Sequence, residues 1–319
     1  MIRKQVVSGL FDSLVNKRVS ILYNERMYPV KKRLEENWVY YAFSGFKVLN
    51  AELERRGRPV ESFAAIGSGN GVDALGAHFV FKKAKRFFIT DIDSEVIGLA
   101  LNNFHNNCER RTGLEVTALS GNLTAPLVEK EVECDLVYAN LPNIPLWSES
   151  QKKGFGLSTF YNPGAVDRVP SKIGDYLLGL QYRFLRSAPA SLSKKGSVVQ
   201  LIGGRFPVKI FDALFKRTEF ELESLCLGFK PQTEAKEVLE GYSRAEKQNG
   251  VEFIFYDYAR GLKRLRALGE SNLVVGKKMF FLEKELGDFA FTATQALKEF
   301  KGGKRIGHSC HVLRGKYLS

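Results

Sequence analysis

From about residue 62 to residue 202, short apolar runs alternate with stretches whose apolar positions recur at helical spacing. The apolar runs predict five strands: Phe63–Ile66, Phe87–Thr90, Val116–Leu119, Asp135–Ala139 and Ser197–Ile202. The intervening stretches predict helices, the clearest being Val72–Phe81, Glu95–Asn106 and Tyr176–Arg186. Strands that alternate with helices form a parallel sheet covered on both faces. We therefore expect an α/β fold of the Rossmann-like type.

The regions on either side of these strands carry different patterns. Residues 1–60 are rich in aromatic residues at helical spacing and predict an N-terminal helical cap. Two further strand candidates, Phe220–Cys226 and Val251–Tyr256, would complete a seven-stranded core over residues 61–257, with a charged helical insertion between them. We expect residues 258–319 to form a C-terminal extension packed on this core.

Composition narrows the class of protein further. No apolar run among the 319 residues reaches the roughly 20 residues that span a bilayer, and the N-terminus lacks a signal-peptide pattern. We therefore expect a cytoplasmic protein without membrane contact. The four cysteines have no Cys-x-x-Cys spacing, which predicts reduced thiols and no metal site. The formal net charge of +13 would suit nucleic acid, but the basic residues are thinly spread, which argues against such a partner.

A glycine-rich stretch follows the first predicted strand. Gly67, Gly69 and Gly71 alternate with Ser68 and Asn70, and a helical pattern begins directly afterwards. Glycines let the backbone turn sharply and let a ligand approach without interference from a Cβ atom. In open α/β sheets, nucleotide-type ligands bind at the carboxyl ends of the strands. We predict that the cofactor binds at Gly67, Ser68, Gly69 and Gly71; a tight turn without a ligand is the alternative.

An acidic residue ends the second predicted strand, about twenty residues after the glycines. A carboxylate in this position accepts hydrogen bonds from ribose hydroxyls. Asp93 is better placed to cap the following helix, so we assign the ribose to Asp91, with Ile92 beside it. Asn122 and Leu123 follow the third strand, where we expect a loop that contacts adenine.

The fourth predicted strand runs directly into an Asn-x-Pro turn formed by Asn140, Leu141 and Pro142. Proline fixes the loop, and the asparagine offers a carbonyl and an amide at the carboxyl edge of the sheet. We predict that Asn140 and Pro142 are catalytic positions that place the acceptor, and that Asn140 also contacts the cofactor. A purely structural turn is the alternative.

Taken together, these stretches resemble class I S-adenosylmethionine-dependent methyltransferases, especially those with an Asn-Pro-Pro-aromatic motif, such as the glutamine N5-methyltransferases of release factors. The resemblance implies a seven-stranded Rossmann-like sheet and S-adenosylmethionine as cofactor. The motif here reads Asn140-Leu141-Pro142-Asn143 and lacks the aromatic residue that stacks on an amide or base. Ala65 stands two positions before the first glycine, where the family usually has an acid, which implies that the methionine end of the cofactor is held differently.

The chain is similar over nearly its whole length to the N-terminal methyltransferase domain of methionine S-methyltransferases. The similar stretches occur in the same order: Glu36–Tyr41, Ile66–Gly71, Leu141–Ile144, Gly203–Arg205 and Gly302–His308. The aminotransferase-like C-terminal portion of that family has no counterpart in these 319 residues. This resemblance implies transfer of a methyl group to a small amino-acid-like acceptor, at a thioether or an amine.

Methyl transfer from a sulfonium to such an acceptor depends on in-line positioning and exclusion of water more than on acid–base help. Aromatic faces stabilise a sulfonium by cation–π attraction, about 0.5–2 kcal/mol each. We predict that Arg205 pairs with a carboxylate of the acceptor, a solvated arginine being the alternative. The aromatic residues predicted to wall the substrate pocket, each with a place in the core as its alternative, are Trp38, Tyr40, Tyr41, Tyr161 and Tyr176, of which Tyr176 is also a catalytic candidate.

Two other kinds of function stay open. In a cyclase, the amine of S-adenosylmethionine would attack its own γ-carbon, releasing methylthioadenosine and azetidine-2-carboxylate, and the absence of an acid at Ala65 suits a free amine. An RNA or protein methyltransferase, or a binding module without catalysis, would suit the positive charge.

Overall fold

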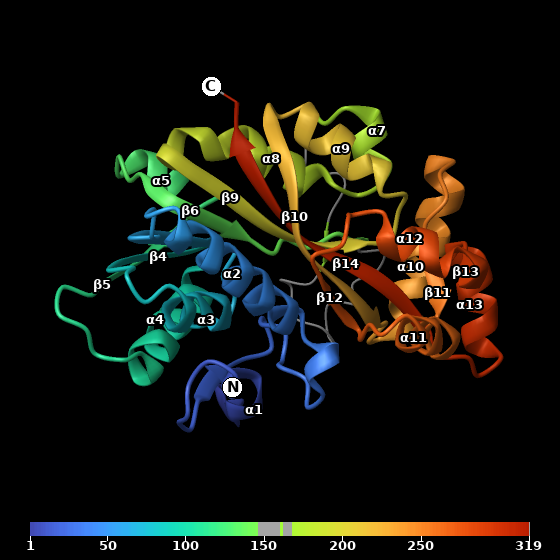
Figure 1. The fold of residues 1–319 in the computed structure, drawn as a ribbon, viewed down its shortest axis with the longest axis horizontal. Coiled ribbons are helices and arrows are strands. Elements are labelled where there is room, and N and C mark those ends of the chain that lie inside the picture. Colours follow the sequence, from blue (N-terminus) through green and yellow to red (C-terminus); the bar gives the residue numbers. More distant parts are fainter. Residues whose placement is uncertain (146–159, 162–167, 319) are drawn as a thin grey trace.

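The computed structural model describes residues 1–145 and 168–318, together with the backbone of residues 160 and 161. Seven strands of its ten-stranded main sheet form the core in the order β5–β4–β3–β6–β9–β14–β10 (Figure 1). Among these seven, β14 is antiparallel to both neighbours and the other pairs are parallel. The predicted α/β fold with a Rossmann-like, seven-stranded core sheet is confirmed by this order. The seven strands are Ser62–Ile66 (β3), Arg86–Asp91 (β4), Glu115–Ser120 (β5), Cys134–Ala139 (β6), Leu192–Gly204 (β9), Phe220–Pro231 (β10) and Ile306–Tyr317 (β14).

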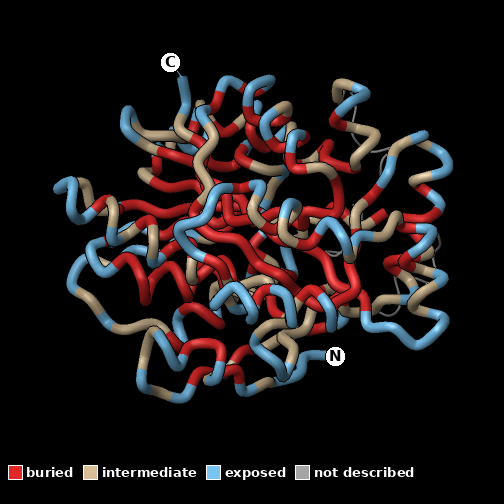
Figure 2. Tube along the Cα trace, turned by 45° about the vertical axis from the view of Figure 1, so that its right-hand side comes forward, coloured by how far each residue is buried: buried red, intermediate tan, exposed pale blue. Residues whose placement is uncertain are grey.

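Alternate residues of the strands supply two hydrophobic cores, one on each face of the sheet. Phe63 and Ala65 of β3 belong to the core shared with the first set of helices, whereas Ala64 and Ile66 belong to the core on the opposite face. Figure 2 shows these buried positions running through the middle of the molecule. The first face carries α2 (Trp38–Arg55), α3 (Val72–Val80) and α4 (Ser94–Asn107), and the second carries α5 (Ala125–Glu129), α7 (Ser171–Gly174), α8 (Gly179–Ser187) and α9 (Lys209–Lys216).

Residues 258–318, predicted as an extension packed on the core, contribute one strand to the core sheet itself. The last strand of the core is β14, which lies between β9 and β10 and pairs with both along its length. The candidate Val251–Tyr256 forms only a short strand, β11 (Phe255–Asp257), which pairs with the first residues of β14. The apolar pattern of β14 is interrupted by four polar residues that are nevertheless buried: His308, Ser309, His311 and Arg314.

Additional elements surround the end of the sheet near β10 and β14. The predicted charged insertion is α10 (Ala235–Asn249), which packs against α13 (Ala293–Lys301). The remaining elements here are α11 (Tyr258–Ala267), β12 (Leu273–Val275), α12 (Phe281–Leu286) and β13 (Ala290–Phe291). A separate two-stranded pair, β7 (Ile144–Pro145) with β8 (Phe160–Tyr161), has its first strand packed against α10. Within the described ranges, no helix is both long and apolar enough to cross a membrane.

The N-terminal region is only partly the predicted helical cap. A hairpin of β1 (Arg3–Val6) and β2 (Ser20–Tyr23), with the short helix α1 (Ser8–Phe11) between its strands, precedes α2. Two asparagines one helical turn apart on α4 hold β2. The Asn103 amide accepts from the N–H of Leu22 at 2.6 Å and donates to its carbonyl at 2.7 Å, and Asn107 does the same for Ser20. These amides pair with β2 as a neighbouring strand would.

Candidate functional site

The turn after β3 is built on glycines in the left-handed region of φ, where other residues are strained. Gly67, Gly69 and Gly71 have φ angles of 62°, 53° and 78°. A Cβ atom on Gly71 would lie 2.9 Å from the carbonyl oxygen of Ala100, so this glycine is required for α3 to approach α4. A Cβ on Gly69 would meet nothing within 4 Å, because this part of the turn faces an open cavity. The backbone of the turn is therefore exposed to a ligand.

The carboxylate of Asp91, at the tip of β4, is fixed to this turn. Its Oδ2 accepts a 2.9 Å hydrogen bond from the N–H of Gly69, and its Oδ1 accepts one of 3.1 Å from the N–H of Asp93. Burial raises the pKa of Asp91, and these backbone donors act in the opposite direction. Each oxygen keeps acceptor capacity beyond its single backbone donor. Asp93 caps α4, as the sequence predicts, by accepting from the N–H of Glu95.

The remaining residues predicted to bind the cofactor lie beside Asp91 at the same edge of the sheet. The side chain of Ile92 is 74% exposed. Asn122 is also exposed, and Leu123 is half-buried with a left-handed φ of 52°. The N–H of Gly121 donates to the carbonyl of Asp91 at 2.9 Å and so connects this loop to β4. Together they form an open shelf next to the cavity instead of part of its wall.

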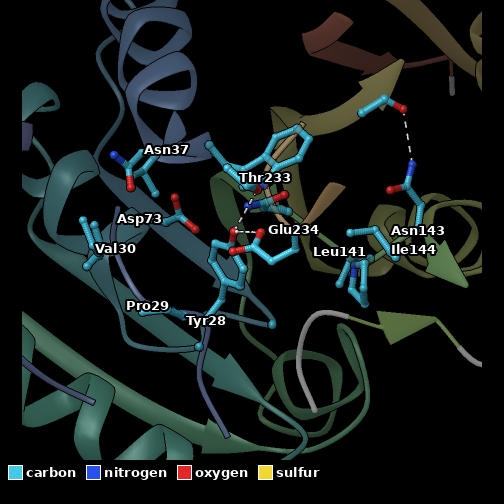
Figure 3. Close-up of a pocket in the computed structure, with 18 of the residues that line it drawn as sticks. Tyr28, Pro29, Val30, Asn37, Asp73, Leu141, Asn143, Ile144, Thr233 and Glu234 are labelled. Atoms are coloured by element: carbon cyan, nitrogen blue, oxygen red, sulfur yellow. Dashed lines mark hydrogen bonds between the residues drawn. The ribbon is translucent and has the colours of Figure 1, made fainter. Parts of the chain in front are cut away.

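The cavity brings together segments that are far apart in the sequence (Figure 3). Gly67, Ser68 and Gly69 line it on one side, and Asn140 and Pro142 line it at the end of β6. The other segments in its wall are 28–30, 37–39, 203–205 and 232–238. Two predicted acceptor-binding residues, Trp38 and Arg205, are also in this wall. The structure thus places the glycine turn, the Asn-x-Pro turn and Arg205 around one space, with Asp91 attached to its rim.

The loop after β6 is held from several sides. The side-chain amide of Asn143 donates to the carbonyl of Gly203 at 3.2 Å (Figure 3). The backbone carbonyl of Asn143 accepts a 2.7 Å hydrogen bond from the hydroxyl of Tyr242. The amide of Gln181 donates to the carbonyl of Leu141 at 3.0 Å. The loop therefore presents Asn140 and Pro142 to the cavity from a fixed backbone.

Arg205 is fully buried and has only neutral partners among the described residues. Its guanidinium donates to Gln232 at 2.9 Å, to His308 at 3.1 Å and to Asn143 at 3.4 Å. Since arginine has no acceptor, Nε2 of His308 accepts and its Nδ1 donates to the carbonyl of Ser309. Burial lowers the pKa of His308, which keeps this ring neutral. The solvated alternative for Arg205 does not apply.

A second buried cation lies next to Arg205. The ammonium of Lys230 donates to the carbonyl of Glu36, and burial lowers the pKa of Lys230 to about 7. The ring of Trp38 lies 4.8 Å from this ammonium and 5.5 Å from the Arg205 guanidinium. Both charges therefore contact one indole at the end of the cavity. Buried cations without an acidic partner create a strong preference for an anion.

Acidic side chains lie on other parts of the cavity wall. Glu234 has a left-handed φ of 49° and accepts a 2.8 Å hydrogen bond from the Tyr28 hydroxyl (Figure 3). It also forms an ion pair with Lys31. This contact holds segment 28–30 over the cavity. Asp73, in the first turn of α3, is buried and accepts a 3.3 Å hydrogen bond from the Tyr138 hydroxyl. Burial raises the pKa of Asp73 to about 7.

Three of the aromatic residues predicted to wall the substrate pocket lie outside the wall of this cavity. Tyr41 is fully buried against Gly228 of β10, because it lies one turn after Trp38 on the sheet-facing side of α2. Tyr40 packs edge-on against Tyr41. Tyr176, the catalytic candidate, packs against Phe206 and Phe253. The side chain of Tyr161 lies outside the described residues.

Several residues of the site were not predicted from the sequence. They are Asp73, Asn143, Lys230, Gln232, Tyr242 and His308. Two of them carry a signal that sequence reasoning could have used. Asp73 is the single acid in the otherwise apolar helix α3, and Lys230 is a lone cation at the apolar end of β10. Charged residues are rarely buried without a partner, so a charged residue within a buried helix or strand is a candidate for an interaction in the interior.

No protein-family model and no curated protein matches the chain. Among solved structures, precorrin-6y C5,15-methyltransferase from Geobacter metallireducens is 9% identical, with 93% of this chain and 100% of that chain covered and a TM-score of 0.38. The YcgJ protein from Bacillus subtilis is 12% identical, with 87% and 98% covered and a TM-score of 0.43. The ribosomal protein L11 methylase from Lactobacillus delbrueckii is 15% identical, with 57% and 69% covered and a TM-score of 0.36. With TM-scores below 0.5, these likenesses carry no argument about this site.

Proposed function

We propose that the chain is an S-adenosylmethionine-dependent methyltransferase whose acceptor is a small amino-acid-like molecule with a carboxylate. The observation that carries the choice of acceptor is the fully buried Arg205, which lines the cavity and has no acidic partner among the described residues. A guanidinium in such a place is stabilised by a ligand carboxylate, which it binds through two parallel hydrogen bonds.

The residues at the rim fit the cofactor. The open face of Gly69 gives a ligand access to the backbone, and the Asp91 carboxylate is positioned to accept hydrogen bonds from ribose hydroxyls. Ile92, Asn122 and Leu123 form the shelf proposed for adenine. S-adenosylmethionine supplies an electrophilic methyl group on a sulfonium. The strand tips would orient this group toward Asn140, which lines the same cavity as Gly67.

The proposed contribution of the protein to the reaction is positioning. Asn140 and Pro142, on the fixed loop after β6, would hold the acceptor, and Arg205 with Lys230 would anchor its carboxylate. Segment 28–30, held by the Tyr28–Glu234 hydrogen bond, would exclude water. Alignment of this kind replaces acid–base help when the nucleophile is a thioether. The similarity to methionine S-methyltransferases favours a thioether such as that of methionine, with a neutral amine as the other nucleophile.

Mass spectrometry of the products tests this proposal. We expect S-adenosylhomocysteine only when an acceptor such as methionine is added. Arg205→Met should raise the acceptor KM at least 30-fold, because one charge-assisted carboxylate contact contributes about 2 kcal/mol or more. Arg217→Met, which replaces an exposed arginine, is the control and should leave KM within twofold. The Tm values of Arg217→Met and Arg205→Met should both stay near the Tm of the unmodified protein.

Two outcomes would overturn methyl transfer to a small molecule. Methylthioadenosine formed from S-adenosylmethionine alone would support the cyclase instead. RNA binding that weakens with salt, without turnover of the cofactor, would support a binding module.

A further inference from the structure

Asp73 is a buried acid in the cavity wall that no step above uses. It lies in the first turn of α3, directly after the glycine turn. Its Oδ1 accepts the 3.3 Å hydrogen bond from Tyr138, and Oδ2 makes no hydrogen bond within the described part of the chain. No lysine or arginine among those residues forms an ion pair with it. A buried carboxylate in this state requires a cationic partner or a proton.

Asp73 is connected through Tyr138 to Ala65, a strand position that carries no acid. Ala65, where related enzymes usually have an acid, is the register partner of Tyr138 in the neighbouring strand β6. Both side chains belong to the same hydrophobic core, on the face of the sheet that α3 covers. The Tyr138 hydroxyl extends from this pair to Asp73. A carboxylate from α3 is thus held beside the strand position that has lost its own.

The charges around the cavity are separated in a way that suits a zwitterion. Asp73 lines it together with Gly67 and Gly69, next to the proposed cofactor, whereas Arg205 and Lys230 flank Trp38 at the segment where β9 ends. Arg205, which lines the cavity, is therefore available to the acceptor carboxylate. The acid is available to a positive group on the cofactor.

We propose that Asp73 binds the α-ammonium group of the methionine moiety of S-adenosylmethionine, in place of the acid absent at Ala65. This inference rests on the proposed function. The Tyr138 hydrogen bond orients one carboxylate oxygen and leaves the other for the ammonium group. Holding the amine in its protonated form also occupies its lone pair, so the amine does not attack the γ-carbon of its own cofactor.

Calorimetry with two ligands that differ in the amino-acid moiety tests the assignment. S-adenosylhomocysteine carries the α-ammonium group, whereas methylthioadenosine lacks the whole amino-acid end. At pH 8, Asp73→Asn should weaken S-adenosylhomocysteine binding 10- to 100-fold and change methylthioadenosine binding less than twofold. Asp212→Asn, which replaces an exposed acid in the first turn of α9, is the matched control and should change neither.

The outcomes separate this inference from the function on which it rests. If the unmodified protein binds neither ligand, the proposed function fails. If it binds both and Asp73→Asn keeps full affinity for S-adenosylhomocysteine, gains affinity for it, or loses both ligands equally, only the assignment of Asp73 is wrong. Asp73→Ser gives a second test if the Asn variant does not fold, and it should show the same selective loss. Tyr138→Phe keeps the carboxylate and should weaken S-adenosylhomocysteine binding less than Asp73→Asn does.

Discussion

The backbone N–H of Gly69 donates a 2.9 Å hydrogen bond to Oδ2 of Asp91, so the turn after β3 and the tip of β4 form one rigid unit. Asp91→Ala should therefore weaken S-adenosylhomocysteine and methylthioadenosine alike, about 10- to 100-fold, because both ligands carry the ribose and a charge-assisted hydrogen bond contributes about 1.5–3 kcal/mol. Calorimetry on both ligands checks this. Unchanged affinity for methylthioadenosine would remove Asp91 from the proposed ribose site.

Trp38 contacts both buried cations, and its substitution should act on the acceptor and not on the cofactor. Trp38→Leu should raise the acceptor KM about 5- to 30-fold, since cation–π contacts of about 1–2 kcal/mol hold Arg205 and Lys230 in place. Tyr40→Phe is the control, because Tyr40 lies outside the cavity wall. Steady-state kinetics with varied acceptor measure both. Equal effects of the two substitutions would contradict the placement of Trp38.

Lys230 should make stability depend on pH. Burial lowers the pKa of Lys230 to about 7, whereas an unfolded lysine titrates near about 10.4, so between these values the unfolded state binds more protons. The free energy of unfolding of the unmodified protein should therefore rise as pH increases through this window. Lys230→Met removes the penalty of the buried charge and should stabilise the ligand-free protein at pH 6.5 by up to about 4 kcal/mol.

Urea unfolding at pH 6.5 and pH 9.5 measures the difference in free energy of unfolding between Lys230→Met and the unmodified protein. This difference should be smaller at the higher pH. The same variant should bind a carboxylate acceptor more weakly, because it has lost one of the two cations. A variant less stable than the unmodified protein at both pH values would contradict the prediction.

Two helical glycines give opposite predictions for the same substitution. A Cβ on Gly76 would lie 1.8 Å from Cε1 of the buried Phe43 ring, so Gly76→Ala should force α3 away from α2 and lower the free energy of unfolding by about 1–3 kcal/mol. Gly98 in α4 is exposed, and its Cβ would meet nothing within 4 Å. Gly98→Ala should raise the free energy of unfolding by about 0.5–1 kcal/mol. Denaturant titration of both variants is sufficient, and a Gly76→Ala protein of undiminished stability would refute the packing described.

The sequence predicted the strands that are apolar throughout and the polar residues at their tips. Phe63–Ile66 and Asp135–Ala139 are buried on both faces, so their composition matches their environment, and Asp91 and Asn140 follow from where strands end. The place of β14 inside the core sheet was not predicted, because the hydrogen bonds of His308 and the ion pairs of Arg314 let polar side chains occupy buried positions. Such partners come from distant segments and leave no local pattern.

The positions of the predicted pocket aromatics could not be derived from the sequence for a different reason. Residue type predicts that Trp38 and Tyr41 are large and apolar, but one helical turn separates a residue in the cavity wall from one packed against the sheet. Asp73 lines the cavity and Lys230 contacts the Trp38 ring. Both positions depend on the register of strands and helices that only the assembled fold defines.

The place of β14 in the sheet has a consequence for synthesis of the protein. While a growing polypeptide stops short of residue 306, β9 and β10 each present an unpaired edge where β14 will pair. Such edges associate readily with other chains. Ribosome-bound intermediates should therefore be open to proteases and chaperones until residues 306–317 emerge and pair with β9 and β10.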